Sequence, residues 1–148
     1  MDANRQQKKA VVKFKSGKLI KGYIDDFASS VRDVVLTRVD NRQISINVDD
    51  LKAVFFVRSF DGDFSYNESK SFSHSSRDAG KKRVFVKFLD KESVTGYLDK
   101  DIPWQTGFFL SKPDERKTGF FLYPADERSN NMKIYVVNSA VEDVTLIG

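Results

Sequence analysis

The sequence predicts a mainly β protein made of two tandem, strongly bent five-stranded antiparallel barrels, the second with a hairpin insertion. Three observations lead to this fold class: an internal repeat, short segments that alternate apolar and polar residues, and a glycine in the middle of the second segment of each copy. We expect residues 8–57 to form the first barrel and residues 82–148 to form the second.

The internal repeat is visible in an ungapped comparison of the chain with itself. At a shift of 74 positions, Lys8–Phe14 lies over Lys82–Phe88, and seven residues of the first copy recur identically. The ends of the copies align at a shift of 90 positions, where Leu51–Val54 lies over Val141–Val144. Matches at these spacings indicate one duplicated unit. The recurring residues of the first copy are Lys8, Val12, Lys13, Phe14, Gly22, Tyr23 and Asp25.

The difference between the two shifts means that the second copy holds 16 extra residues. Thr106–Leu110 recurs as Thr118–Leu122, which predicts an inserted hairpin at about 106–122. Residues 1–7 are expected to form a flexible tail. Residues 58–81 are rich in serine and are expected to form a linker between the barrels.

Each copy is expected to contain about five short strands, because β-branched and aromatic residues alternate with polar ones between turn residues. A short turn precedes the last strand of each copy. The clearest predicted strands are Ala10–Phe14, Ile20–Ile24, Val34–Leu36, Gln43–Ile46, Val54–Val57, Lys133–Val137 and Val144–Ile147.

The first two strands of each copy are predicted to form a hairpin with a three-residue loop. In the first copy the loop Ser16–Lys18 would place Val12 opposite Gly22, so that one face is apolar throughout. The second copy lacks the loop glycine, and Lys91 would therefore need an unfavourable backbone conformation, or the second copy would need a different turn.

The same register predicts an aromatic surface on the outward face. It places Val11 opposite Tyr23 in the first copy and Phe85 opposite Tyr97 in the second. Exposed apolar side chains often mark contact surfaces, so these four residues are candidate binding residues. In the alternative interpretation, linker residues such as Phe60 or Phe64 cover this surface.

The first copy resembles the Sm-like small β-barrels in the pattern Val12-x-Phe14-x-Ser16-Gly17-x-x-Ile20-x-Gly22-x-Ile24-x-x-Phe27. This resemblance implies a bent five-stranded barrel, assembly into rings by pairing of edge strands, and, for many such proteins, RNA binding. The family's RNA-pocket residues are not matched. Ala28–Arg32 follows Phe27, and the last turns, Val48–Leu51 and Asn138–Val141, lack the family's Arg-Gly pair.

The composition argues against catalysis. The chain has no cysteine and one histidine, His74, which disfavours a zinc site and a nucleophilic centre based on Cys or His. No phosphate-binding glycine loop is present. We therefore expect a protein that is not an enzyme and needs no cofactor or metal. The longest uncharged apolar run, Ala53–Val57, is too short to cross a membrane, and a cytoplasmic location is expected.

Two binding functions follow from these features. The favoured prediction is a protein-interaction or self-assembly module, with a homo-oligomer as the expected state. The alternative is binding of RNA or single-stranded nucleic acid, because the net charge is +4 and the first copy is locally basic. The candidate residues for the alternative are Lys13, Lys15, Lys18, Lys21 and Lys87.

Overall fold

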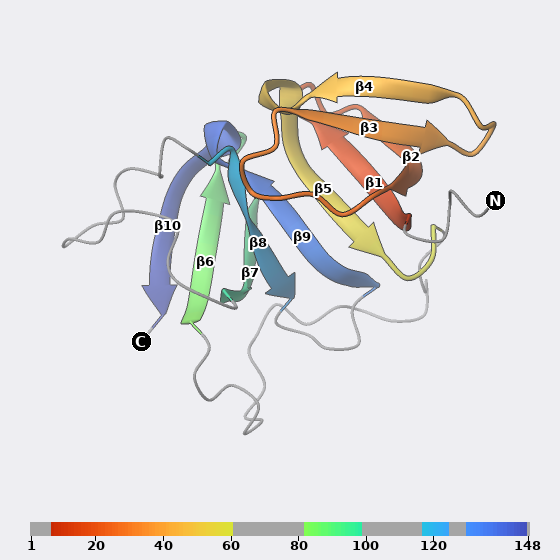
Figure 1. The fold of residues 1–148 in the computed structure, drawn as a ribbon. Coiled ribbons are helices and arrows are strands. Elements are labelled where there is room, and N and C mark those ends of the chain that lie inside the picture. The colour runs from red at the N-terminus through yellow and green to blue at the C-terminus, as the bar shows by residue number, and fades with distance from the viewer. Residues whose placement is uncertain (1–6, 61–81, 99–116, 125–129, 148) are drawn as a thin grey trace.

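A computed structural model describes residues 7–60, 82–98, 117–124 and 130–147 of the chain (Figure 1). These ranges contain ten antiparallel strands and two short 3₁₀ helices, η1 and η3. The first copy comprises β1 (Lys8–Phe14), β2 (Leu19–Ile24), β3 (Asp33–Arg38), β4 (Gln43–Asn47), η1 (Val48–Asp50) and β5 (Leu51–Val57). The second comprises β6 (Lys82–Phe88), β7 (Ser93–Leu98), β8 (Gly119–Pro124), β9 (Asn131–Val137), η3 (Asn138–Ala140) and β10 (Val141–Ile147).

All ten strands belong to one sheet, in the order β10-β6-β7-β8-β9-β5-β1-β2-β3-β4. The prediction of a mainly β, antiparallel fold is confirmed. The sheet is continuous, because β5 of the first copy pairs with β9 of the second, and it is not a closed barrel, because the described end strands β10 and β4 do not pair with each other. The prediction of two tandem five-stranded barrels is therefore not confirmed. Within the sheet both copies have the same internal order, since β10-β6-β7-β8-β9 corresponds strand for strand to β5-β1-β2-β3-β4.

Apolar side chains form two separate core clusters, one for each copy. The first is built on residues such as Val12, Leu36 and Phe56, all fully buried. The second is built on counterparts such as Val86 and Leu122. The predicted alternation in the first strand of each copy places these valines inside, so the copies bury equivalent positions.

The hairpin register differs from the predicted one by two residues. Val12 lies opposite Ile20 and Ala10 opposite Gly22, because the three-residue loop starts one position earlier, after Phe14. The cause is Gly17, whose positive φ of 94° suits the last position of such a loop.

The second hairpin shows the same shift, with Val86 opposite Val94. Lys91 occupies the position of the loop glycine with a φ of 77°, which is the first of the two possibilities that the sequence left open. The cross-strand pairs predicted for the outer face are therefore wrong. Val11 lies opposite Lys21 and Phe85 lies opposite Thr95.

Glycines in the second strand of each copy allow a neighbouring strand to approach closely. A Cβ atom on Gly22 would lie 2.6 Å from the Thr37 carbonyl oxygen. A Cβ atom on Gly96 would clash in the same way with the Tyr123 carbonyl oxygen. The repeated glycine therefore serves the packing of β2 on β3 and of β7 on β8.

Several predicted segments lie largely or wholly outside the described residues. These are the tail at 1–7, most of the linker at 58–81, and the first part of the predicted insertion at 106–122. Its second part is described, and Thr118–Leu122 leads into and forms most of β8. Neither 3₁₀ helix in the described ranges has the length and apolar character needed to cross a bilayer.

Candidate functional site

The two copies are joined by antiparallel pairing of β5 with β9, which we call the inner joint. Its register places Ala53 opposite Val136 and Phe56 opposite Lys133. The pairing continues beyond the strands, because Asn130 accepts from and donates to the backbone of Ser59 at 3.1 and 2.8 Å. β5 also pairs with β1 on its other side, so it is an interior strand of the sheet.

Side chains cross the inner joint in both directions. Tyr135 and Val137 of β9 belong to the core cluster of the first copy. In return, Ala53 of β5 belongs to the core cluster of the second copy, and Phe55 packs against that cluster. Each core is therefore completed by the other copy, which explains why both faces of β5 are apolar.

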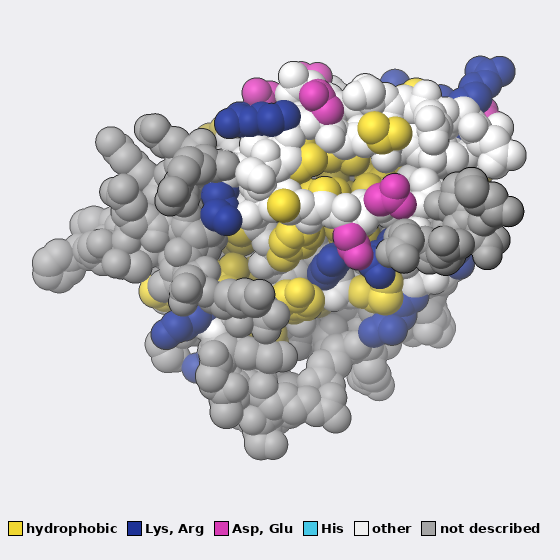
Figure 2. Space-filling model, in the orientation of Figure 1, with side chains coloured by type: hydrophobic (Ala, Val, Ile, Leu, Met, Phe, Trp, Pro, Cys, Tyr) yellow, Lys and Arg dark blue, Asp and Glu magenta, His cyan; other side chains and the backbone are white. Residues whose placement is uncertain are grey.

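Aromatic rings cluster on the first-copy side of the joint. The ring of Phe27 lies 4.8 Å from that of Tyr135 and 5.7 Å from that of Phe121, between ring centroids. Lys133 Nζ lies over Phe121 at 4.8 Å and forms an ion pair with Asp26 at 3.5 Å. Figure 2 shows hydrophobic side chains reaching the surface in the middle of this view, with charged side chains around them.

The segment between β2 and β3 also crosses to the second copy. The Ser29 carbonyl accepts from the Thr118 backbone N–H at 2.7 Å and from the Tyr135 hydroxyl at 3.0 Å. The Tyr135 hydroxyl also lies 2.5 Å from Thr118 Oγ1. Burial raises the pKa of Tyr135 to about 12, so the phenol is neutral and holds these bonds over the physiological range.

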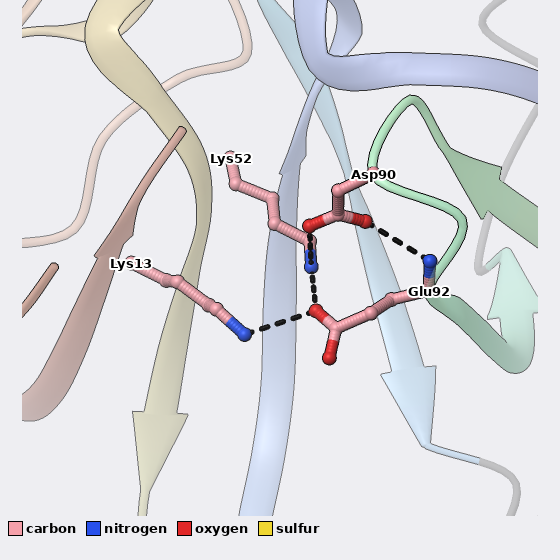
Figure 3. A network of polar contacts seen from close by, with 4 residues as sticks. All are labelled: Lys13, Lys52, Asp90 and Glu92. Atoms are coloured by element: carbon pink, nitrogen blue, oxygen red, sulfur yellow. Dashed lines mark hydrogen bonds and ion pairs between the residues drawn. The ribbon is translucent and has the colours of Figure 1, made fainter. Parts of the chain in front are cut away.

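A network of charged side chains also connects the two copies, next to the inner joint (Figure 3). Lys52 of β5 is 4% exposed, and its Nζ atom binds Asp90 Oδ2 at 2.7 Å and also contacts Glu92 Oε1. Lys13 Nζ lies 3.0 Å from the same Glu92 oxygen. The Lys52 ammonium also lies 4.7 Å from the ring centroid of Phe88. A turn of the second copy thus supplies both carboxylates to a buried lysine of the first.

The network shifts the pKa values of its members. Burial lowers the pKa of Lys52, but hydrogen bonds and charges from Asp90 and Glu92 outweigh burial, and the net pKa is raised. The hydrogen bond from Lys52 lowers the pKa of both carboxyl groups. All three groups are therefore charged at neutral pH, and the charges hold the two copies together.

In the part of the chain that the structure describes, the sheet ends at two strands that pair on one side only, β4 and β10, which we call the open edges. By the repeat, β10 corresponds to β5 and β4 corresponds to β9. The chain therefore contains one joint between two such strands and leaves one strand of each kind at an edge. Among the described residues, β4 pairs with β3 alone and β10 pairs with β6 alone.

The side chains of β10 differ from those of β5 where the two strands correspond. At the positions of Ala53 and Phe55, β10 carries Asp143 and Thr145, both exposed. Leu146 corresponds to the fully buried Phe56 but is 42% exposed. The β10 edge thus has an uncovered apolar residue on one face and polar residues on the other.

The side chains of β4 differ from those of β9 in the same sense. At the positions of Tyr135 and Val137, β4 carries Ser45 and Asn47, both exposed. The two open edges are therefore polar versions of the strands that form the inner joint.

Comparison with known proteins places the chain in a family. Residues 6–148 match the family model of a family of unknown function, DUF6982. The chain belongs to DUF6982. No curated protein and no solved structure matches the chain. Membership of DUF6982 assigns no activity, so the functional inference rests on the geometry of the joint and the edges.

The four candidate aromatic-surface residues do not form the predicted surface. Tyr97 is buried, with 6% of its surface exposed, which contradicts its predicted outward exposure. Tyr23 is half-buried and contacts Phe60 edge to face, at 5.5 Å between ring centroids, so the alternative interpretation of a covering linker residue holds there. Val11 and Phe85 are half-buried. Phe85 lies directly opposite Thr145, beside the open β10 edge.

Four of the five candidate nucleic-acid lysines contact acceptors of the protein. Lys13 pairs with Glu92, and Lys87 pairs with Glu142 at 3.3 Å. Lys15 Nζ donates to Ser139 Oγ at 2.7 Å, and Lys21 Nζ donates to the Phe60 carbonyl at 3.1 Å. Lys18 is exposed in the first hairpin loop region.

Sequence reasoning missed Lys52, the most buried charged residue of the described chain. The signal was available, since a single lysine interrupts the otherwise apolar run Leu51–Val57. Within the described ranges, no group of His, Cys, Asp or Glu side chains could hold a metal ion.

Proposed function

We propose that this chain is a non-enzymatic protein-binding module that pairs its open edge strands, β4 and β10, with strands of a partner protein or of further copies of itself. The inner joint supports this proposal most directly. It is an edge-to-edge pairing of a β5-type strand with a β9-type strand, and the chain keeps an unused strand of each type at the ends of its sheet.

The chemistry of an edge strand fits this role. An edge strand presents backbone N–H and C=O groups that can pair with an added strand, and main-chain hydrogen bonds then supply much of the affinity. Leu146 adds apolar surface that a neighbouring strand would cover, as Phe56 is covered in the inner joint. The polar residues on both edges make this binding weaker than the inner joint.

The proposal extends to the architecture. We infer that each copy is one Sm-like unit, bent around a core that the other copy completes, and that the two units stand side by side in the continuous sheet. Two observations support this inference: the identical strand order of the copies and the separate core clusters.

Nucleic-acid binding has less support from the geometry. Its candidate lysines are largely engaged with acceptors of the protein, which would have to be released before phosphates could be bound.

Hydrogen exchange and sedimentation of nuclease-treated protein test the proposed function. On concentration, we expect a larger particle and slower amide exchange in β4 and β10, with exchange in the interior strands β1 and β6 unchanged as the internal control. Unchanged edge exchange in a chain that stays monomeric would contradict self-association. Loss of a particle on nuclease treatment alone would favour nucleic acid.

A further inference from the structure

We propose that the occupant of the open β10 edge is strand β4 of a second copy of this chain, and that Asp143 and Thr145 hold this outer joint to a weak, reversible affinity. This inference rests on the proposed edge binding and names the partner, the register and the residues that limit affinity.

The inner joint supplies the register of the outer joint. Ala53 lies opposite Val136, and Phe55 lies opposite Ile134. At the shift of 90 positions these pairs become Asp143 opposite Ile46 and Thr145 opposite Ile44. The next pair becomes Leu146 opposite Gln43.

The side chains of β5 restrict which strand it can pair with. Lys52 on β5 is buried and requires carboxylates at the positions that Asp90 and Glu92 occupy. The first copy carries Ser16 and Lys18 there, so a β4 strand placed against β5 would leave Lys52 facing a second lysine. β5 therefore accepts β9 and rejects β4.

β9 is already paired with β5 of its own chain. The strands left at the edges of the described sheet are β10 and β4, and pairing of β10 with β4 of another copy joins chains head to tail. In that pairing Asp143 takes the place that Ala53 has in the inner joint, so its carboxylate is directed toward the first core of the other copy, and burial of a charge there lowers the affinity.

The outer joint would have fewer apolar side chains than the inner one. Thr145 replaces Phe55 on β10, and Ser45 replaces Tyr135 on β4. Phe85, half-buried and opposite Thr145, occupies the position that Val11 has opposite Phe55 in the inner joint. An apolar residue at position 145 would thus extend an existing apolar surface toward the incoming copy.

The first test gives β10 the residues that β5 has at the same two positions, Ala53 and Phe55, in place of Asp143 and Thr145. We expect Asp143→Ala combined with Thr145→Phe to tighten self-association roughly tenfold to hundredfold in sedimentation velocity, since it removes a charge and adds one buried aromatic side chain. The milder Asp143→Asn, which keeps an acceptor for Thr145 Oγ1, is expected to tighten it about threefold to tenfold. Asp40→Asn is the matched control, because it removes an exposed charge from the β3–β4 turn and leaves the Asx bond to Arg42 possible.

Cysteine pairing tests the register in a chain that has no native cysteine. We expect a disulfide between a Gln43→Cys chain and a Leu146→Cys chain, and none between Gln43→Cys and Thr145→Cys, whose side chains would point to opposite faces. If copies associate but neither the variants nor the cross-link behaves in this way, the outer joint is wrong and edge binding to other strands stands. If no variant associates and the edges exchange freely, both proposals are wrong.

Discussion

Removing the carboxylates that surround Lys52 should destabilise the protein more than removing Lys52 itself. We consider Asp90→Asn combined with Glu92→Gln, which deletes two charges and keeps similar shapes. In the unchanged protein the Glu92 backbone N–H donates to Asp90 Oδ1 at 3.0 Å. The asparagine side chain keeps an acceptor for this N–H, so the turn is retained. The change therefore isolates the loss of charge around a lysine that is 4% exposed.

The magnitude follows from the geometry of the network. A hydrogen bond to a charged group contributes about 1.5–3 kcal/mol, and leaving a fully buried ion unpaired costs about 3–5 kcal/mol. The side chains of Asp90 and Glu92 are 45% and 57% exposed, so solvent screens part of the interaction. We therefore expect a loss of about 2–3 kcal/mol in the free energy of unfolding, which lowers Tm by roughly 5–10 °C.

Lys52→Met should cost less than about 1 kcal/mol, because methionine can keep the apolar contact with Phe88 and the freed carboxylates can be hydrated. Urea unfolding at pH 7 measures all variants. Glu142→Gln is the matched control, because it removes an exposed carboxylate that pairs with Lys87 and Lys91 within one copy, and a change within about 0.5 kcal/mol is expected.

The reasoning would be refuted if Lys52→Met cost more than the double carboxylate variant. It would also be refuted if combining all three changes gave the sum of their separate effects, because the carboxylate changes should cost little once the buried ammonium is gone.

Further predictions concern acid, backbone and hydroxyl contacts. Folding lowers the pKa values of Asp90 and Glu92, so their contribution to the free energy of unfolding should be complete above about pH 5 and should be lost as the pH falls through the lowered pKa values. In urea unfolding from pH 7 to pH 2, the double variant should therefore lose less stability toward acid than the unchanged protein. Gly22→Ala should cost about 2–4 kcal/mol in thermal unfolding, because its Cβ meets the backbone of β3, and a cost below 1 kcal/mol would contradict this close approach. Lys91→Gly should stabilise the second hairpin by about 0.5–1 kcal/mol by relieving a positive φ, and destabilisation would show that the Glu142 pair matters more. Absorbance at 295 nm should show that Tyr135 ionises only near pH 12, as a component of the titration that is absent in Tyr135→Phe.

The sequence predicted the strands well, and also the residues of the first strand of each copy that face the core, because both depend on local patterns. Val12 and Val86 lie in the two cores as their alternation indicated. The hairpin register was missed by two residues because a three-residue loop can be placed around Gly17 in more than one way, and only its positive φ at the last loop position decides between them.

The inner joint could not be predicted because it pairs strands that are far apart in the sequence. A local signal existed in β5, since the run Leu51–Val57 is apolar on both faces and a strand with two apolar faces needs cover on each side. Likewise, Tyr97 matches Tyr23 in sequence but is buried, because burial depends on surroundings that differ between the copies.

The inner joint within a chain and the contacts between chains form at very different effective concentrations. Because β5 and β9 belong to one chain, the inner joint forms at the effective concentration of a tethered pair, on the order of millimolar or above, however dilute the protein is. Contacts between chains have no such advantage and obey mass action. Dilution should therefore release whole chains with both copies still joined, and any closed assembly of this protein must contain an even number of repeats.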